Sequence, residues 1–211
     1  MTSEPETHPL AAETTGLVHP WADPPAGGTA TAVAPGIQWV RMPLPFALDH
    51  INLWLMDDGA GVTVVDTGVG LRPTRARWER LFAGALAGKP IERVIVTHFH
   101  PDHMGNADWL ARRFGVDLWC AQVEWLMCQL AWQGMGGNDS EKRMSHYRRH
   151  GVGDAQIEAF RDRGNHYRKV VPSVVPQFRA VREGDVLEIG GRHLSSLRVF
   201  QQPASVLSQV R

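Results

Sequence analysis

Residues 97–105 read THFHPDHMG, so three histidines and an aspartate fall within six consecutive positions. This stretch directly follows the apolar run IERVIV, which has the texture of a buried strand. His98 and His100 are spaced to share one side of an extended segment, and two further polar residues, Asp102 and His103, follow at the turn into the next helix. Neutral imidazole and carboxylate groups are suitable ligands for Zn²⁺, and also for iron or manganese. The pattern therefore predicts two ligand pairs that hold two metal ions about 3.5–4 Å apart, His98 with His100 and Asp102 with His103.

The segments around this stretch predict an α/β fold. Runs rich in branched and aromatic residues are typical of strands, and four of them read IQWVRMPL, INLWLMDD, VTVVDTG and IERVIVTH. Residues 72–88 carry apolar side chains on one helical face and end at Gly88, a residue that favours helix termination. Residues 36–120 thus alternate strands with helices around the metal-like stretch, which predicts a sheet covered by helices.

The sequence resembles the metallo-β-lactamase-fold hydrolases. Their H-x-H-x-D-H signature is matched by His98, His100, Asp102 and His103. A second family feature, an aspartate at a strand end before a Gly turn, is matched by Asp66 in VVDTG, and PFALDHINLWLMDDG is similar to the opening strands of glyoxalase II-like members. The resemblance implies an αβ/βα sandwich with two Zn²⁺ sites, for which Fe or Mn are alternatives.

The same resemblance implies a reaction and residue roles. It implies a metal-dependent hydrolase that directs a metal-bound hydroxide at an ester, thioester, lactone, amide or phosphodiester. Asp102 would bind the second metal ion beside the attacking water, as the catalytic residue, and Asp66 would shape the site without binding metal. A further, minor hypothesis within the same fold is an oxygen-using iron enzyme that holds a single iron ion with this motif.

The chain is expected to form one main domain at residues 34–199, with a helical insertion at about 122–168. Residues 1–33 are rich in Pro, Gly, Ala and Thr and predict a flexible N-terminal tail. Residues 200–211 depart from the family pattern and are expected to form an atypical C-terminal tail. The second half of the sandwich is therefore expected to be incomplete.

The family pattern requires further ligands after the segment EGDVLEIGG. There, members have a Gly-His-x-Pro-x-His-like loop that supplies a third histidine, followed by a bridging aspartate and a last histidine. When Pro203 is matched to the proline of that loop, Gln201 takes the place of the histidine. The alternative hypothesis is therefore a truncated or frame-altered family member with a vestigial metal site and no turnover, a binding module at most.

Two other histidines are candidates for supporting roles. His193 lies close in sequence to the expected third ligand, although it precedes the loop by several residues, and His50 would line the pocket mouth or cap a strand. His146 and His150 have the i, i+4 spacing that can share a metal ion. Because arginines surround this last pair and repel a cation, we expect it to form a solvated basic face.

Composition and charge limit the classes of molecule that this chain is expected to bind. The 22 basic and 22 acidic side chains cancel, which gives no field that points to nucleic acid or to an anionic membrane, and no apolar run approaches a membrane span. Cys120 and Cys128 are expected to be buried free thiols in a cytoplasmic protein. Residues 141–169 hold eight Lys or Arg against four acids. If this basic segment forms one wall of the active site, it would suit a small anionic substrate. The alternative is a helical face that is simply solvated. An incomplete sandwich would also expose an apolar sheet face, which favours a homodimer.

Overall fold

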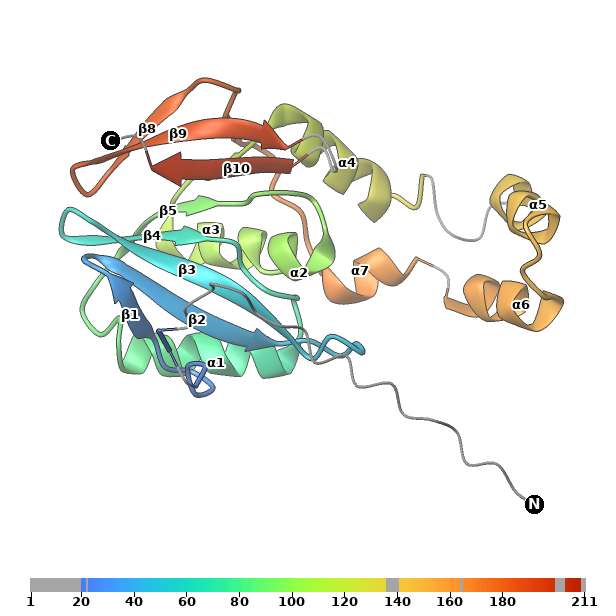
Figure 1. The fold of residues 1–211 in the computed structure, drawn as a ribbon, viewed down its shortest axis with the longest axis horizontal. Coiled ribbons are helices and arrows are strands. Elements are labelled where there is room, and N and C mark those ends of the chain that lie inside the picture. Colours follow the sequence, from blue (N-terminus) through green and yellow to red (C-terminus); the bar gives the residue numbers. More distant parts are fainter. Residues whose placement is uncertain (1–19, 22, 136–140, 164, 200–203, 210–211) are drawn as a thin grey trace, which may run out of the picture.

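The computed structural model describes residues 20–21, 23–135, 141–163, 165–199 and 204–209, which form two β-sheets with surrounding helices (Figure 1). The strands are β1 (Thr31–Ala34), β2 (Ile37–Pro43), β3 (His50–Asp58), β4 (Gly61–Val65), β5 (Ile91–Ile95), β6 (Leu118–Cys120), β7 (Arg179–Ala180), β8 (Val186–Ile189), β9 (Arg192–Val199) and β10 (Ala204–Gln209). The helices are α1 (Arg72–Ala83), α2 (Pro101–Met104), α3 (Ala107–Phe114), α4 (Gln122–Trp132), α5 (Glu141–Arg149), α6 (Asp154–Arg163) and α7 (His166–Val170).

The larger sheet has seven strands in the order β1-β2-β3-β4-β5-β6-β7. The first four strands are antiparallel neighbours, whereas β4, β5, β6 and β7 are parallel. Parallel neighbours require crossover connections, and the helical segments between β4 and β7 supply them. The carboxyl ends of β4 and β5 consequently meet at one edge of the sheet.

One face of the larger sheet packs against α1 and α3. Trp78 and Leu81 of α1 and Leu110 of α3 are fully buried in a cluster with strand residues such as Val64 and Val94. The alternation along β3, where Leu53 and Leu55 are buried in this cluster, directs every second side chain to this face. The polar end of Trp78 is satisfied as well, because its Nε1 donates to the carbonyl of Thr67 at 3.0 Å.

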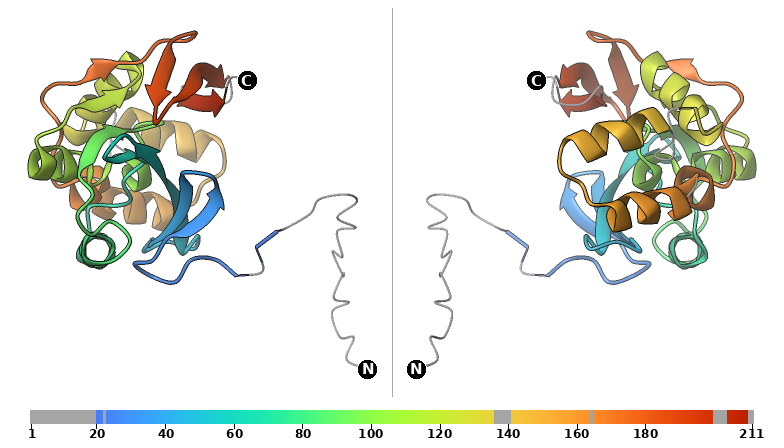
Figure 2. Two further views of the ribbon diagram at one scale, coloured as in Figure 1. Left: turned by 90° about the vertical axis from the view of Figure 1, so that its left-hand side faces the viewer. Right: turned by 90° about the vertical axis from the view of Figure 1, so that its right-hand side faces the viewer.

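The opposite face is partly covered by a three-stranded sheet in the order β10-β9-β8 (Figure 2). A second apolar cluster fills the space between the sheets, and its members are Met56, Val65, Ile95, Val181, Leu187, Ile189 and Leu194. Helices, sheet and second sheet therefore lie in layers, and the predicted α/β sandwich is confirmed.

Two strands were not predicted from the sequence. β1 overlaps the end of the expected N-terminal tail, and β10 falls within the expected C-terminal tail. Both depend on pairing with a neighbour: Ala204 of β10 lies opposite Val199 of β9, and Thr31 of β1 lies opposite Trp39 of β2. The rest of the expected N-terminal tail up to residue 19 lies outside the described residues, and so does Gln201.

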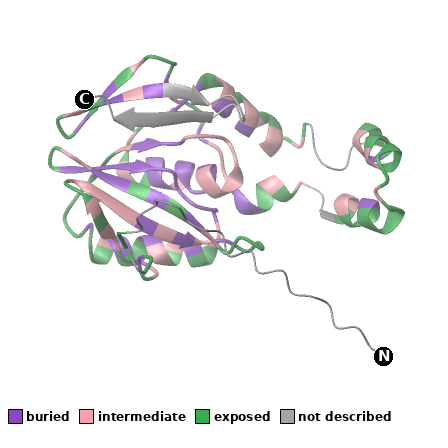
Figure 3. Cartoon of the chain, in the orientation of Figure 1, coloured by how far each residue is buried: buried purple, intermediate pink, exposed green. Residues whose placement is uncertain are grey.

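The described residues between 122 and 170 carry the helices α4, α5, α6 and α7. α5 and α6 project beyond the ends of the sheets and are mostly exposed, as Figures 1 and 3 show. Met144 and Ile157 are their buried apolar residues. Among the described residues, no helix combines the length and apolar character that a bilayer crossing demands.

The two cysteines are buried free thiols, as predicted. Cys120 ends β6 and Cys128 lies on α4. Burial raises the pKa of the Cys120 thiol to about 12 and that of Cys128 to about 11, with the neighbouring Cys128 adding to the shift of Cys120. Both side chains therefore stay protonated at neutral pH and act as small apolar groups.

The turn after β4 packs against the end of α2 with almost no space between the two backbones. A Cβ placed on Gly105 would lie 2.4 Å from the Gly70 nitrogen and 2.6 Å from the Gly68 carbonyl oxygen. Asn106 is fully buried here, and its Nδ2 donates to the carbonyls of Thr67, Gly68 and Val69 at 3.1, 3.2 and 2.7 Å. This contact fixes the position of α2 relative to the end of β4.

We predict that Gly105→Ala destabilises the fold by about 1–3 kcal/mol, because the obstructing atoms are backbone and cannot move aside. The φ of Gly105 is −59°, so any residue can adopt its backbone conformation and steric overlap is the cause of the loss. Urea unfolding followed by circular dichroism measures the effect. The matched control is Gly153→Ala, where the new Cβ meets its nearest atom at 3.7 Å, and its loss should stay below about 1 kcal/mol. Equal losses in the two variants would contradict the prediction.

Candidate metal centre

The predicted ligands gather where β4 and β5 end. Asp66 directly follows β4, and residues 97–100 leave β5 in a bend before α2 begins at Pro101. His98 and His100 thus lie on a bend, not on the continuous extended segment expected from their spacing. Because β4 and β5 are parallel neighbours, their carboxyl ends bring Asp66 next to Thr97, and ligands in open α/β sheets commonly bind at such an edge.

His98 and His100 present two ring nitrogens to each other. Nε2 of His98 lies 3.1 Å from Nδ1 of His100, and the ring centroids are 4.6 Å apart. Two imidazole nitrogens at about 2.0–2.1 Å from a tetrahedral Zn²⁺ are separated by about 3.3 Å, which is close to this spacing. The two side chains therefore fit a shared metal ion without rearrangement.

Asp102 and His103 form the second pair. Nε2 of His103 lies 3.5 Å from Oδ2 of Asp102, and the ring of His103 is 3.8 Å from that of His98 between centroids. The two pairs are therefore adjacent. Within the described parts of the chain, no three His, Cys, Asp or Glu side chains together form a group that could hold a metal ion. The described residues thus supply two-ligand pairs that suit metal ions, and a fully coordinated site needs further ligands.

Asp66 links the ends of the two strands. Its Oδ1 accepts from the Thr97 backbone N–H at 2.9 Å, and its Oδ2 lies 2.9 Å from Nδ1 of His103. Asp66 adopts a φ of 63°, which is uncommon for a residue with a side chain and turns the backbone sharply after β4. The bond to Nδ1 places the proton of His103 on that nitrogen and leaves Nε2 free to face Asp102.

Thr97 determines which ring nitrogen of His98 carries the proton, as Asp66 does for His103. Its hydroxyl lies 2.9 Å from Oδ2 of Asp66, to which it donates, and 3.1 Å from Nδ1 of His98, from which it accepts. Nδ1 of His98 then carries the proton and Nε2 holds a free lone pair toward His100. One carboxylate therefore orients one histidine of each pair.

Burial and neighbouring charge set the protonation of the histidines. Burial lowers the pKa of His98 to about 4, with the nearby His103 and His100 adding to the shift, and burial lowers the pKa of His100 as well. Burial alone would also lower the pKa of His103, but the hydrogen bond to Asp66 and the charges of Asp66 and Asp102 outweigh it and raise the pKa. His98 and His100 are therefore neutral at physiological pH, the form that binds metal.

Three other residues at the site were missed by the sequence analysis. Thr67 donates through Oγ1 to the His103 carbonyl at 2.6 Å, Glu124 Oε2 accepts from the Phe99 N–H at 2.9 Å, and the Tyr167 hydroxyl donates to the Phe99 carbonyl at 2.5 Å. Thr67 and Thr97, as the residues beside Asp66 and His98, could have been suspected. Glu124 and Tyr167 could not, because they lie 25 and 68 positions from Phe99.

The supporting histidines lie elsewhere. Nδ1 of His50 lies 2.6 Å from the Asp49 carboxylate at the start of β3, and His193 is exposed on β9 opposite Glu188. In the described part of the chain, neither makes a hydrogen bond or ring contact with the four predicted ligands. The rings of His146, on the projecting helix α5, and His150, directly after that helix, are 4.1 Å apart.

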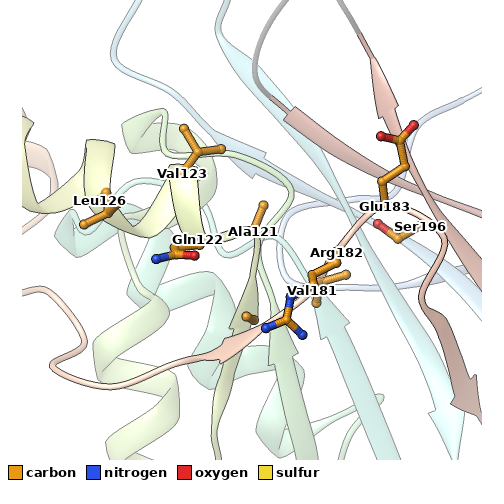
Figure 4. Close-up of a pocket in the computed structure, with 9 residues that line it drawn as sticks. Ala121, Gln122, Val123, Leu126, Val181, Arg182, Glu183 and Ser196 are labelled. Carbon is orange, nitrogen blue, oxygen red and sulfur yellow. The ribbon is translucent and has the colours of Figure 1, made fainter.

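A hollow of about 470 Å³ lies away from this centre, between α4 and the chain that runs from β7 to β8 (Figure 4). Its lining includes Gln122, Leu126, Arg182, Glu183 and the buried Ser196. It contains no histidine and none of the predicted ligands. The histidine centre is therefore the better candidate for catalysis, because it combines metal-binding groups with altered pKa values.

Comparison with known protein families matches a region that contains this centre. A family model described as metallo-beta-lactamase superfamily matches residues 47–194. Over 70 residues the chain is 36% identical to a probable metallo-hydrolase, YqjP, of Bacillus subtilis. The matched stretch covers 33% of this chain and 22% of that protein. Over 69 residues it is 38% identical to an atrochrysone carboxyl ACP thioesterase of Aspergillus fumigatus, covering 32% of this chain and 21% of that protein.

Solved structures share the fold. A beta-lactamase domain protein from Burkholderia ambifaria has a TM-score of 0.76 and 39% identity, with 90% of this chain and 56% of that chain covered. A metallo-beta-lactamase family protein from Thermus thermophilus has a TM-score of 0.64 and 23% identity, with 83% and 56% covered. The chain thus spans about half the length of these structures, and its matches span about a fifth of the curated relatives.

We predict that Asp66→Asn weakens Zn²⁺ binding by roughly 10–100-fold. The amide would accept from Thr97 through its oxygen and turn its NH₂ toward His103, whose Nδ1 must then accept. The ring proton moves to Nε2 and blocks the nitrogen that faces Asp102. Competition with a chromophoric chelator measures the affinity. The control is Asp49→Asn, whose carboxylate is 85% exposed and bonds His50, and it should bind like the wild type. Unchanged affinity in Asp66→Asn would refute the role given to this carboxylate.

Proposed function

The chain belongs to the metallo-β-lactamase superfamily, and we propose that it carries the first ligand pairs of a metal-dependent hydrolase acting on an ester, thioester, lactone, amide or phosphodiester. The observation that supports this most directly is the adjacent placement of the two pairs, His98 with His100 and Asp102 with His103, at the carboxyl edge of β4 and β5. Since the chain spans about half of its solved relatives, the activity of the whole protein is part of the proposal.

In this proposal each pair holds one metal ion, Zn²⁺ first, with Fe or Mn as alternatives. A bound ion lowers the pKa of water and polarises the carbonyl or phosphoryl group under attack. Asp102 has a side chain that is 24% exposed, so its carboxylate reaches solvent and can accept a hydrogen bond from the attacking water. His103 keeps its orientation through Asp66, and the neutral imidazoles of His98 and His100 need not lose a proton before binding metal.

Thioesters stand first among the candidate substrates, because the Aspergillus relatives are named as thioesterases of an acyl carrier protein. The projecting helix α5 favours an anionic substrate. Lys142, Arg143, His146 and Arg149 line a shallow hollow of about 390 Å³ on one side of α5.

Acidic side chains of α5 and α6 form ion pairs with two other arginines of these helices. Arg148 bonds Glu141 at 3.1 Å and Asp154 at 3.2 Å, and Arg161 also bonds Glu141. These carboxylates of α5 and α6 therefore pair with Arg148 and Arg161, which are not among the residues that line the hollow. A phosphate-bearing thioester would complement the basic lining.

A cytoplasmic location and a homodimer belong to the same proposal. The free thiols Cys120 and Cys128 suit a reducing compartment. Trp54 shares the sheet face of Met56, yet it is 39% exposed, so β8 to β10 leave an aromatic surface that a second copy would cover.

A second candidate function is the inactive binding module. It is favoured by the two-ligand pairs, because the described residues offer no three-ligand group. This alternative and the hydrolase differ in metal stoichiometry and in turnover.

We predict about two equivalents of metal per chain after gentle purification, with thioester hydrolysis that is lost on chelation and restored by adding the metal back. Elemental analysis by mass spectrometry identifies the metal. His98→Ala should lose both metal and activity, whereas His150→Ala, an exposed histidine directly after α5 that is not among the lining residues of the basic hollow, should keep both. Metal far below one equivalent that dialyses away, together with no turnover, would favour the inactive module.

We further predict that Lys142→Glu with Arg149→Glu raises the KM for a coenzyme A thioester by roughly 3–10-fold, since each lost surface charge contact contributes up to about 1 kcal/mol. The KM for an uncharged thioester should not change. Lys89→Glu is the control, because Lys89 precedes β5 at the opposite edge of the sheet and pairs with Asp57. Equal effects on the two substrates would contradict an anion site on α5.

A further inference from the structure

The backbone of Phe99 lies between the two histidines of the first pair, and both its N–H and its carbonyl are hydrogen-bonded by side chains. Its N–H donates to Oε2 of Glu124 at 2.9 Å, and its carbonyl accepts from the Tyr167 hydroxyl at 2.5 Å. Both side chains come from the helical segment that follows β6, Glu124 from α4 and Tyr167 from α7. The N–H belongs to the peptide group between His98 and Phe99 and the carbonyl to that between Phe99 and His100, so a change in the backbone dihedral angles of Phe99 would turn the two histidines relative to each other and change the spacing of their ring nitrogens.

Glu124 lies in an unusual place for a carboxyl group. Its side chain is 0% exposed, in the first turn of α4. Burial of a carboxyl group carries a large desolvation cost unless hydrogen bonds compensate, and the backbone N–H of Phe99 supplies one. A buried carboxyl at this position is therefore hard to explain by packing alone.

Tyr167, on α7, bonds the carbonyl of Phe99, whereas Glu124 bonds its N–H. Its ring lies nearly parallel to that of Phe99, with centroids 6.5 Å apart. Burial, with the nearby Cys128, raises the pKa of its phenol, so the hydroxyl is protonated and can donate at neutral pH.

The two helices are fixed to each other and to the chain after them. Nδ2 of Asn165, which precedes α7, donates to the carbonyls of Ala131 and Trp132 near the end of α4 at 3.2 and 3.0 Å. Nε1 of Trp132 donates to the Val171 carbonyl at 3.1 Å. Glu124 and Tyr167 therefore approach Phe99 from one connected unit, and neither can move without the other.

We propose that Glu124 and Tyr167 are positioning residues that set metal affinity by holding the backbone N–H and carbonyl of Phe99, and with them the two peptide groups between His98 and His100. The inference rests on the proposed metal site and adds a role for the helical insertion, which the sequence analysis had treated as a wall for substrate. It assigns the geometry of the first ligand pair to contacts that are remote in sequence.

The test uses three variants and one control. Glu124→Gln keeps an acceptor for the Phe99 N–H, Glu124→Leu removes it at similar volume, and Tyr167→Phe keeps the ring but loses the hydroxyl. Tyr147→Phe is the control, because Tyr147 lies on α5 and packs against Phe160. Co²⁺ is the probe, since its visible absorption reports ligand geometry as well as affinity. Exchange of the Phe99 amide proton, followed by NMR in metal-free protein, reports the hydrogen bond directly.

We expect Glu124→Leu and Tyr167→Phe to weaken Co²⁺ binding by roughly 10–100-fold and to alter the spectrum, while Glu124→Gln and Tyr147→Phe stay near wild type. The Phe99 amide should exchange faster in Glu124→Leu than in Glu124→Gln. If Glu124→Leu does not fold, Tyr167→Phe decides alone. Wild-type affinity and spectrum in Tyr167→Phe would overturn the inference and leave the metal site standing. A wild-type chain that binds no Co²⁺ would overturn the metal site, and this inference with it.

Discussion

The carboxylate of Asp66 is the contact on which the centre depends. It stands at a left-handed corner after β4 and reaches across to the end of β5, where it accepts from Thr97 and bonds His103. Through the Thr97 hydroxyl it also fixes the ring of His98. A single buried side chain therefore joins two strands that are distant along the chain and selects the nitrogen that each of two histidines leaves free.

Sequence reasoning recovered what local pattern determines. The fully buried β4 and the helix α1, with Trp78 and Leu81 on one face, follow from hydrophobic periodicity. The ligand pairs, which were predicted from residue type and spacing, remain a prediction. It missed β1 and β10, whose short sequences become strands through pairing. It missed Glu124 and Tyr167 for a similar reason, since a contact between distant residues leaves no periodic signal in a single sequence.

The structure also changes how the helical insertion is understood. α5 and α6 project from the body, and their basic side supports the proposal of an anionic substrate. α4 and α7 lie against the bend after β5 and bond its backbone. This helical segment thus contains two parts with different environments, an exposed pair of helices and a pair that bonds the bend carrying the proposed ligands.

This division constrains how such a protein can diversify. Substitutions on α5 and α6 alter an exposed surface that projects beyond the ends of the sheets, so in the proposed hydrolase this surface can vary at little cost to the proposed metal centre. Substitutions on α4 and α7 that displace Glu124 or Tyr167 alter the hydrogen bonds to the Phe99 backbone. Mutations in these two helices should therefore show epistasis with the histidines, and a directed-evolution library confined to α5 and α6 should retain more metal-competent members.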